Sequence, residues 1–456
     1  MSGYSPHTPA DVDAMLRAIG VTSIDDLFAQ VPAGVRARAA LALADGLSEP
    51  ALRQQLEALA ARNTGALLPA VFLGAGAYPH WIPAVVDQML QRAEFATAYT
   101  PYQPEVSQGT LQAMFEFQTF SALLLGLDVA NASMYDGASA TAEAVLMARR
   151  VLPGRRTVWL SRALHPHYRA TVATYVGGLG DLVLRELPFA ADGRTDLGPL
   201  RTAGDDMLCV VLGYPNVFGV FDDVVGAARL ARAAGALTIT ATAEPLALAL
   251  ARSPGGSGAD ISVAEGQSFG LPVSYGGPGV GLFATREMHI RSMPGRIVGE
   301  TVDTQGRRGY VLTLATREQH IRRERATSNI CTNQGLCALA VTVYLSLLGR
   351  HGLRRLAEVN AAAAHDVATR LTAAGVAQRF DGPFFNEFVV RAPDAVARWE
   401  AQAADGLVAG FPLRRWYPEL DDALLVCVTE RHRAEDVDQL VTALAPAAAR
   451  ARAVRG

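Results

Sequence analysis

Short apolar runs and segments with a helical period alternate through the middle of the chain, from about residue 130 to residue 285. The apolar runs have the length and composition of buried strands, and the segments between them repeat apolar residues every three or four positions. The predicted strands are 156–160, 182–187, 207–213, 236–242, 260–264 and 280–285, and the predicted helices are 138–150, 166–177 and 223–234. This alternation indicates an α/β fold in which helices cover both faces of a parallel sheet.

The region before the alternating pattern is predicted to be helical, with one polar turn. Three short amphipathic helices start at Thr8-Pro9, at Ser23 and at Ser48-Glu49-Pro50. They have little core of their own, so we expect them to pack on the main body or on a partner. A helix from Ile82 to about Phe95 and a helix from Thr110 to Leu125 flank the turn 99–105, where two prolines exclude a helix.

The region after the alternating pattern predicts a smaller domain. The helical stretches 334–349 and 353–373 lead into strands near 376–380, 385–391 and 423–428, and a final helix starts at Ala434. We therefore predict three parts: an N-terminal helical extension (1–70), a large parallel-sheet domain (71–345) and a small C-terminal α+β domain (346–456).

Composition changes this picture in one respect that matters for chemistry. The chain has 456 residues, half of them apolar, which is enough for a large core and a second domain. Its net charge of −3 gives no basic field for nucleic acid. The chain has 41 arginines and no lysine, a bias that a GC-rich genome would explain. Whatever its cause, the chain has no side-chain primary amine and cannot form an internal Schiff base.

The cysteines and the apolar runs bear on the compartment. Cys209, Cys331, Cys337 and Cys427 are scattered and suit buried thiols in a reducing compartment. The first residues lack the apolar core of a signal peptide, and the longest apolar run, near 121–127, is too short to span a bilayer. We expect a cytoplasmic protein with no membrane partner.

Two segments have features of cofactor binding, although each has a common structural explanation. The segment from Tyr135 to Thr141 places small residues and hydroxyls at a helix N-terminus, where free backbone N–H groups can hold a phosphate. Capping is the more frequent role of such residues. Glu244 follows the predicted strand 236–242, and an acid at a strand end can pair with a ring nitrogen of a cofactor. A loop acid with no such role is the alternative.

The segment 258–279 carries more information. A short strand is followed by a polar turn with Gln267 and Ser268 and then by the glycine-rich turn Tyr275-Gly276-Gly277-Pro278. In aspartate-aminotransferase-type enzymes that use pyridoxal phosphate (PLP), a lysine follows the strand at this point. An amide or a hydroxyl cannot condense with an aldehyde as that amine does.

Two further groups of residues each have a functional and a structural interpretation. The arginine-rich stretch from Arg317, predicted as a helix, could bind an anion or could be a solvated helix face, and the polar loop 327–333 after it resembles the edge of a site. His165 and His167 have weak metal-like character, but no acid or thiol cluster is near them in the sequence, so loop histidines are the better interpretation.

Long motifs give the chain a resemblance to a known family. They are FLGAGAYPHWIP (72–83), AYTPYQPEVSQGTLQAMFEFQT (98–119), SMYDGASATAEA (133–144), GADISVAEGQSFGLPVSYGGPGVG (258–281), MPGRIVGETVDTQGRRGYVLTLATREQHIRRERATSNICTNQ (293–334) and FFNEF (384–388). Through them the chain resembles the alpha subunits (subunit 1) of two-chain P-proteins, the decarboxylating glycine dehydrogenases of the glycine cleavage system. The resemblance covers nearly the whole chain and implies the PLP-dependent transferase fold type I.

The resemblance also implies a division of labour between two subunits. In this family the beta subunit binds PLP through a lysine, and Gln267 stands at that position here. The active site is then expected at or near the interface of the two subunits. There glycine loses its carboxylate, and the aminomethyl group passes to the lipoyl arm of the H-protein. Whether the assembly is a heterodimer or a dimer of heterodimers stays open.

The resemblance places three segments of this chain at that shared site. The turn with Tyr99, Thr100, Tyr102 and Glu105 is expected to hold glycine or its carboxylate. Tyr275, Gly276 and Gly277 are expected to reach the phosphate of the partner's PLP. The loop 327–333, with Ser328 and Asn329, is expected to bind substrate and to form a wall of the lipoyl channel.

Two alternatives and one departure accompany this interpretation. The chain could be an inert structural or regulatory partner of a PLP enzyme, although the polar loops 99–105 and 327–333 favour a catalytic interface. A self-sufficient PLP decarboxylase or cysteine desulfurase is opposed by the absence of lysine. Glu244 stands where catalytic relatives carry aspartate, which fits a site that has lost its own cofactor.

Overall fold

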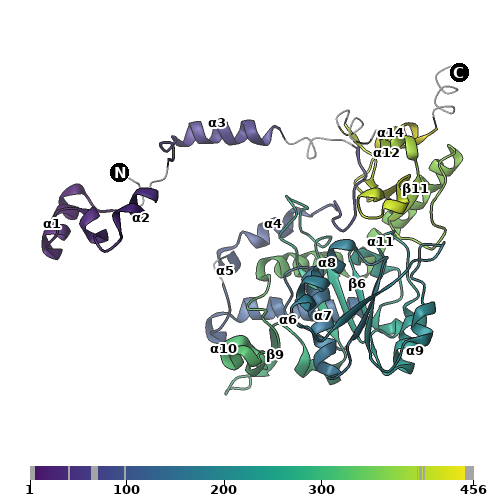
Figure 1. Ribbon diagram of the computed structural model, residues 1–456, viewed down its shortest axis with the longest axis horizontal. Helices are drawn as coiled ribbons and strands as arrows, with labels where there is room; N and C mark the ends of the chain where they lie inside the picture. The colour runs from purple at the N-terminus through teal and green to yellow at the C-terminus, as the bar shows by residue number, and fades with distance from the viewer. Residues whose placement is uncertain are drawn as a thin grey trace. The chain divides into compact units, whose positions relative to one another are not determined.

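The computed structural model describes residues 6–39, 42–62, 70–96, 99–397, 399, 403 and 406–446. The chain divides into two units, Met1–Thr64 and Gly65–Gly456. In Figure 1 the helices of the first unit are purple, and the second unit runs from blue to yellow.

The first unit consists of short helices with almost no core. They are α1 (Pro9–Ile19), the 3₁₀ turn η1 (Ile24–Phe28), α2 (Ala33–Arg38) and α3 (Glu49–Ala60). Thr8 and Ser23 each form a capping box, with Asp11 and Asp26 respectively. Among the described residues of this unit only Leu16 is buried. The expectation that these helices lack a core is confirmed, and the surface that covers them stays a prediction.

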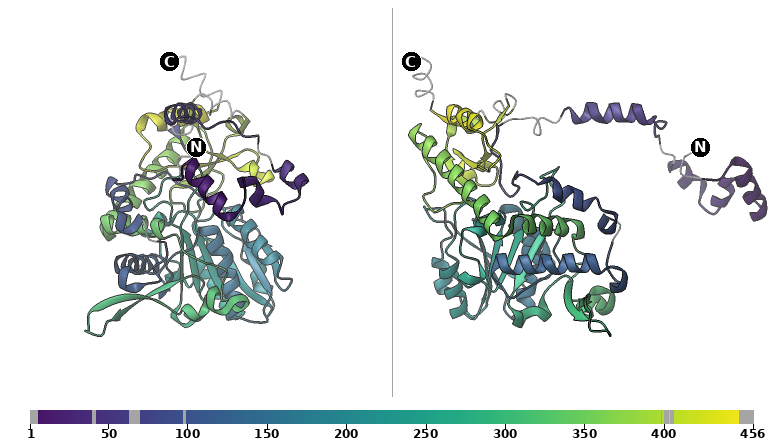
Figure 2. Two further views of the ribbon diagram at one scale, coloured as in Figure 1. Left: turned by 90° about the vertical axis from the view of Figure 1, so that its left-hand side faces the viewer. Right: turned by 180° about the vertical axis from the view of Figure 1, so that it is seen from behind.

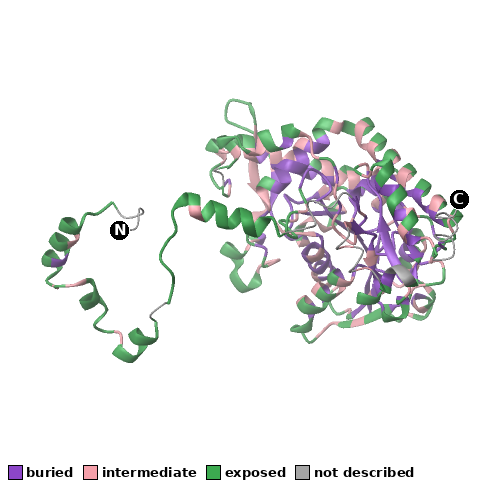
Figure 3. Cartoon of the chain, turned by 90° about the horizontal axis from the view of Figure 1, so that it is seen from above, coloured by how far each residue is buried: buried purple, intermediate pink, exposed green. Residues whose placement is uncertain are grey.

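The second unit is built on a seven-stranded sheet in the order β2-β8-β7-β6-β5-β3-β4. Its strands are β2 (Val129–Ala130), β3 (Thr157–Ser161), β4 (Val183–Leu187), β5 (Met207–Gly213), β6 (Leu237–Thr242), β7 (Ile261–Glu265) and β8 (Gly281–Thr285). Every residue of β5 and β6 is buried, which is the signature of central strands covered on both faces. Figure 3 shows these strands in purple, enclosed by helices whose outer faces are green.

Alternate side chains of β5 point to two different cores. Val210 and Leu212 pack with α6 (Gln108–Leu125), α9 (Val224–Ala233) and the first part of α11 (Gly335–Ala373). Cys209 and Val211 pack on the opposite face with α7 (Gly137–Val151) and α8 (Pro166–Gly177). The predicted α/β fold with helices on both faces is confirmed.

One edge of the sheet corrects the prediction of a parallel sheet. Strand β8 runs antiparallel to both of its neighbours, β7 and β2, while β4, β3, β5, β6 and β7 are mutually parallel. The connection between β7 and β8, residues 266–280, contains turns, among them the glycine-rich turn 275–279, and no helix of the kind that joins parallel strands.

A hairpin and a set of short helical turns follow the sheet. Strands β9 (Ile297–Val302) and β10 (Arg308–Thr313) pair antiparallel and extend away from the central sheet (Figure 2, left view). The predicted arginine-rich helix is wrong, because residues 315–325 form three separate turns, η7 (Ala315–Arg317), α10 (Gln319–Arg322) and η8 (Arg323–Arg325). Arg317 is buried and donates to the carbonyls of Met293 and Gly295, which draws the chain inward at this point.

Helix α11 connects the large sheet to the smaller layer and breaks at Gly349, whose φ of 58° is left-handed. By length and apolar composition this helix could cross a membrane. Its apolar side chains, among them Val341 and Tyr344, belong instead to the core beneath the sheet. The predicted boundary between residues 345 and 346 lies just before the break, and the division into a large and a small domain stays a prediction.

The smaller layer contains the antiparallel sheet β11-β14-β13, formed by Glu387–Arg391, Ala423–Cys427 and Phe411–Pro412. The second half of α11, α12 (Pro393–Ala397) and α14 (Ala434–Leu444) pack against it (Figure 1). The predicted strand 376–380 is wrong, because only Gln378 makes an isolated bridge, to Val390. A short parallel pair, β1 (Ala70–Val71) with β12 (Leu407–Val408), ties the start of this unit to the same layer.

The helices around the polar turn are close to those predicted. The predicted helix 82–95 is divided into α4 (Ala84–Leu90) and α5 (Ala93–Ala96), and the turn contains only the 3₁₀ turn η2 (Pro104–Val106). Helix α6 begins two residues before the predicted start and ends at Leu125 as predicted.

Candidate functional site

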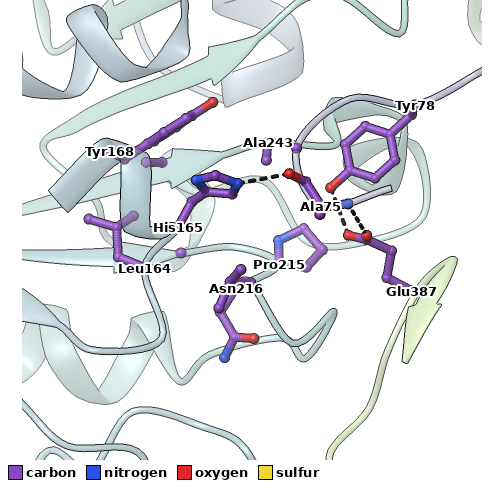
Figure 4. A pocket seen from close by; sticks show the side chains of 13 residues that line it. Ala75, Tyr78, Leu164, His165, Tyr168, Pro215, Asn216, Ala243 and Glu387 are labelled. Carbon is purple, nitrogen blue, oxygen red and sulfur yellow. Dashed lines mark hydrogen bonds between the residues drawn. The ribbon is translucent and has the colours of Figure 1, made fainter. Parts of the chain in front are cut away.

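The carboxyl ends of the parallel strands meet the segment 74–81 and the first strand of the smaller layer. A pocket lies there, lined by Ala75, Gly76, Tyr78, His165, Asn216 and Glu387, among others (Figure 4). In this fold ligands bind at that edge of the sheet. The cavity measures about 10 Å³, which is room for about one water molecule.

Glu387, at the start of β11, holds the segment that fills the pocket. Its carboxylate accepts hydrogen bonds from the backbone N–H of Ala75, at 2.6 Å, and from the hydroxyl of Tyr78, at 2.7 Å (Figure 4). Burial raises the pKa of Glu387 to about 7, although the two hydrogen bonds oppose that rise. Gly76 lies against the ring of His165, and a Cβ there would stand 2.9 Å from Nε2.

Gln267, the residue at the position of the family lysine, is buried and fully engaged. Its Oε1 accepts from the N–H of Tyr78 at 2.8 Å, and its Nε2 donates to the carbonyls of Tyr78 at 3.1 Å and Leu271 at 2.7 Å. The amide thus pairs with both backbone groups of Tyr78, as a neighbouring strand would.

The acid at the end of β6 has a partner from the same segment. Glu244 accepts from His80 Nε2 at 2.9 Å, and the other ring nitrogen, Nδ1, lies 2.9 Å from Glu430 in the smaller layer. Burial lowers the pKa of His80, but the charges and hydrogen bonds of the two carboxylates outweigh it and raise the pKa to about 10. His80 is therefore an imidazolium at neutral pH, shared between two carboxylates.

A further carboxylate lies at the N-terminus of α7, the helix predicted to hold a phosphate. Glu265, the last residue of β7, accepts from the N–H groups of Gly137 at 2.8 Å and Val280 at 2.9 Å. Burial raises the pKa of Glu265 to about 7, against the effect of these hydrogen bonds. Asp136 caps the same helix through the N–H of Ser139, so capping, the more frequent role of such residues, is confirmed here.

These contacts decide whether the residues of this chain fit a PLP group. The chain has no lysine to bind it, and the cavity has room for about one water. The acid, the glutamine and the helix N-terminus that would anchor PLP in this fold are already bonded to the chain itself. The residues present do not fit the cofactor.

A second polar cluster surrounds Arg296, which is 3% exposed. Its guanidinium donates to Thr100 Oγ1 at 3.1 Å, to Tyr102 Oη at 3.0 Å, to Thr332 Oγ1 at 3.2 Å and to the carbonyl of Cys331 at 2.6 Å. Its Nε lies 3.7 Å from the carboxylate of Glu318. One buried cation, Arg296, thereby joins the turn 99–105, predicted to bind substrate, to the predicted site loop 327–333.

The remaining predicted site residues are placed less tightly. Tyr99 is 79% exposed and lines a small apolar pocket with residues from the starts of α6 and α11. Glu105 and Asn329 are exposed. Ser328 is half-buried, and its hydroxyl accepts from the N–H of Ile330. The structure thus brings Thr100 and Tyr102 together with the loop.

The turn of Tyr275, Gly276 and Gly277 lies outside the Arg296 cluster. It is an exposed tip in which Tyr275 is 92% exposed and both glycines have left-handed φ values, 96° and 158°. It leads into β8 beside the N-terminus of α7.

The two histidines considered as metal ligands have other roles. His165 Nε2 lies 2.8 Å from the carbonyl of Ala75, and burial lowers the pKa of His165 to about 4. His167 packs edge-on against His165 and Trp416. Within the described ranges no group of three or more histidine, cysteine, aspartate or glutamate side chains could hold a metal ion.

Comparison with known proteins identifies the family. The sequence matches the family described as glycine cleavage system P-protein over residues 2–444. This chain belongs to that P-protein family. It is 57% identical to the probable glycine dehydrogenase (decarboxylating) subunit 1 of Anaeromyxobacter dehalogenans strain 2CP-C, covering 95% of this chain and 97% of the relative. It is 48% identical to the protein of the same description from Desulfotalea psychrophila, covering 97% and 98%.

Solved structures agree with this assignment. A crystal structure of glycine decarboxylase (P-protein) of the glycine cleavage system, in inhibitor-bound form, has a TM-score of 0.88 and 43% identity, covering 97% of this chain and 99% of that one. A sphingosine-1-phosphate lyase from Burkholderia pseudomallei, at 17% identity and a TM-score of 0.65, shows the fold alone. The predicted fold type I and the predicted P-protein family are both confirmed.

Several residues of the two clusters were not predicted from the sequence. Arg296 and Glu387 lie within quoted family motifs, MPGR and FFNEF, but nothing local marks either side chain as buried. His80 is 164 residues from its partner Glu244. The available signal was the pair of glycines at 74 and 76, which indicates a backbone in close contact with its surroundings.

Proposed function

We propose that this P-protein subunit works with a beta subunit that carries PLP, to decarboxylate glycine and to pass the aminomethyl group to the lipoyl arm of the H-protein. The observation that carries this proposal is the Arg296 cluster on a chain whose own cofactor position is filled. Such a chain can supply substrate-binding groups to a neighbour's active site, although it cannot anchor the cofactor itself.

PLP on the partner would supply the electron sink for loss of the carboxylate. The contribution of this chain is to bind and orient. The hydroxyl oxygens of Thr100 and Tyr102 both accept from Arg296, so each hydroxyl keeps its own proton free to donate. Two hydroxyl donors polarised by a buried cation suit the carboxylate of glycine.

The other two segments have roles proposed from the family resemblance. The exposed turn of Tyr275, Gly276 and Gly277 would reach the phosphate of the partner's cofactor. The loop with Ser328 and Asn329 would form one wall of the channel for the lipoyl arm. We further propose that the subunits form a heterotetramer in the cytoplasm, and native mass measurement of the purified complex tests its stoichiometry.

The test of the function is exchange of labelled bicarbonate into glycine, with PLP and lipoylated H-protein present. We expect exchange only when the beta subunit is added to this chain. Exchange by this chain alone would overturn the proposal. A well-formed complex that exchanges no faster than the beta subunit by itself would instead establish an inert structural partner.

A further inference from the structure

The segment 74–80 occupies the place at the strand ends where this fold binds its cofactor. Its backbone lies on the ring of His165, where Gly76, with a φ of 101°, leaves no room for a side chain. Glu387 fixes it from the smaller layer through Ala75 and Tyr78. Such close packing at a site that elsewhere in the fold is a ligand pocket requires an explanation.

Three positions that anchor a cofactor in this fold were identified from the sequence: the acid Glu244, the lysine position Gln267 and the N-terminus of α7 at Gly137. Each now has a partner within the chain. His80 Nε2 lies on Glu244, the backbone of Tyr78 on Gln267, and the Glu265 carboxylate on the N–H of Gly137. In that order, these partners correspond to the ring N–H of the cofactor, to the cofactor group that meets the lysine, and to the cofactor's phosphate.

We propose that segment 74–80, together with Glu265, is an intramolecular replacement for the cofactor. His80 takes the place of the protonated ring nitrogen that would bind Glu244. The backbone of Tyr78 takes the place of the cofactor group that would meet residue 267. Glu265 takes the place of the phosphate anion at the N-terminus of α7. This assignment holds whether or not a partner subunit carries PLP.

The electrostatics of the site explain why a replacement is needed. Glu244 is 3% exposed, and a buried carboxylate without a cationic partner is strongly destabilising. The imidazolium of His80 supplies that charge, and its second nitrogen binds Glu430, which also accepts from Asn360 and from the N–H of Trp81. The replacement therefore also ties the strand ends of the large sheet to the smaller layer.

Chemical rescue tests the central contact. The variant His80→Gly in the full-length chain removes the imidazole and leaves space between Glu244 and Glu430. We expect its thermal midpoint to fall by several degrees, and millimolar imidazole at pH 7 to restore at least half of that loss. The matched control is His432→Gly, because His432 is partly buried and stacked on Phe72, and among the described residues its ring nitrogens bond to backbone groups and not to a carboxylate. Imidazole that stabilises both variants equally, or neither, would overturn the proposal.

If His80→Gly does not fold, a double-mutant cycle with His80→Gln and Glu244→Gln replaces it. We expect the two single variants to be coupled by at least tenfold in the unfolding equilibrium constant, about 1.4 kcal/mol. Additive effects would show that the two side chains do not form the proposed pair.

The filled position is tested by restoring the amine. In Gln267→Lys, PLP followed by borohydride should label residue 267 no more than it labels the exposed lysine of the control Arg325→Lys, as read by peptide mass spectrometry. Arg325 is a suitable control because its side chain is 83% exposed and its closest carboxylate, Glu324, is 3.9 Å away. Stoichiometric labelling at position 267 in a folded variant would mean that the place is open to the cofactor, and the proposal would fail.

Discussion

Replacement of Arg296 by methionine is the sharpest test of the shared site. The change keeps an unbranched apolar stem and removes the guanidinium, which makes two hydrogen bonds to the substrate turn and two to the loop 327–333. Hydrogen bonds to a charged group contribute about 1.5–3 kcal/mol each. Tyr102 is 58% exposed, so water can replace part of what the turn loses.

We therefore expect a loss of about 2–3 kcal/mol in transition-state stabilisation from the two bonds to the turn, which is about 30- to 160-fold in kcat/KM for glycine. The assay is bicarbonate exchange with the beta subunit and H-protein. Arg296→Lys should lose less of kcat/KM than Arg296→Met, because it keeps the positive charge. It should still fall below the wild type, because its single nitrogen cannot span Thr100, Tyr102 and the loop. The matched control is Arg325→Met, which removes an exposed arginine and should leave the rate unchanged.

A positioning role and a general loss of stability can be separated. Tyr102→Phe deletes only the hydroxyl that accepts from Arg296, so the double variant with Arg296→Met should lose less than the sum of the two single losses. The thermal midpoint of the complex is measured alongside. Wild-type exchange by Arg296→Met, or strictly additive effects of the two changes, would refute the role assigned to this arginine.

Two further predictions concern the segment that fills the cofactor position. Glu387 has a pKa of about 7 in the folded chain against 4.5 ordinarily, so its contribution to stability is full below pH 4.5 and is lost as the pH rises toward 7. Glu387→Gln, whose amide can still bond Ala75 and Tyr78, should flatten this part of the pH profile in urea unfolding, and a slope equal to that of the wild type would contradict the assignment. Gly76→Ala should lower the free energy of unfolding by about 1–3 kcal/mol more than Gly306→Ala does. Both glycines have left-handed φ, but only a side chain at 76 would meet His165. Equal losses would mean that the backbone is not packed on that ring.

The central strands could be predicted from the sequence because burial on both faces leaves a continuous apolar run. The prediction for 207–213 matches β5 at both ends for this reason. The hairpin β9–β10 was missed because only its first two residues and Tyr310 are buried, so neither strand has a regular apolar period. The arginine-rich stretch was predicted as one helix because its charges suit i,i+4 pairs, but the inward turn of Arg317 depends on carbonyls that lie more than twenty residues earlier.

Part of the candidate site could also be predicted from local sequence, and the rest depends on contacts between distant segments. The turn 99–105 and the loop 327–333 were found because prolines and polar residues mark them locally. Their connection through Arg296 depends on segments separated by 194 to 196 residues on one side and 35 to 36 on the other. No periodicity or spacing rule reports which arginine among so many will be buried against them.

The identity of residue 267 follows from its hydrogen bonds and not from genome composition. A genomic bias from lysine to arginine would explain why all 41 of these residues are arginine, and such a bias would place an arginine at 267 as well. A guanidinium has donors but no acceptor, so it could not accept the N–H of Tyr78 as Gln267 Oε1 does. The glutamine therefore fits the segment that fills the pocket, and the bias does not explain it. Under the proposal above, removal of the amine alone would leave a buried carboxylate and free N–H groups without partners, so the acid and phosphate positions also need replacement groups.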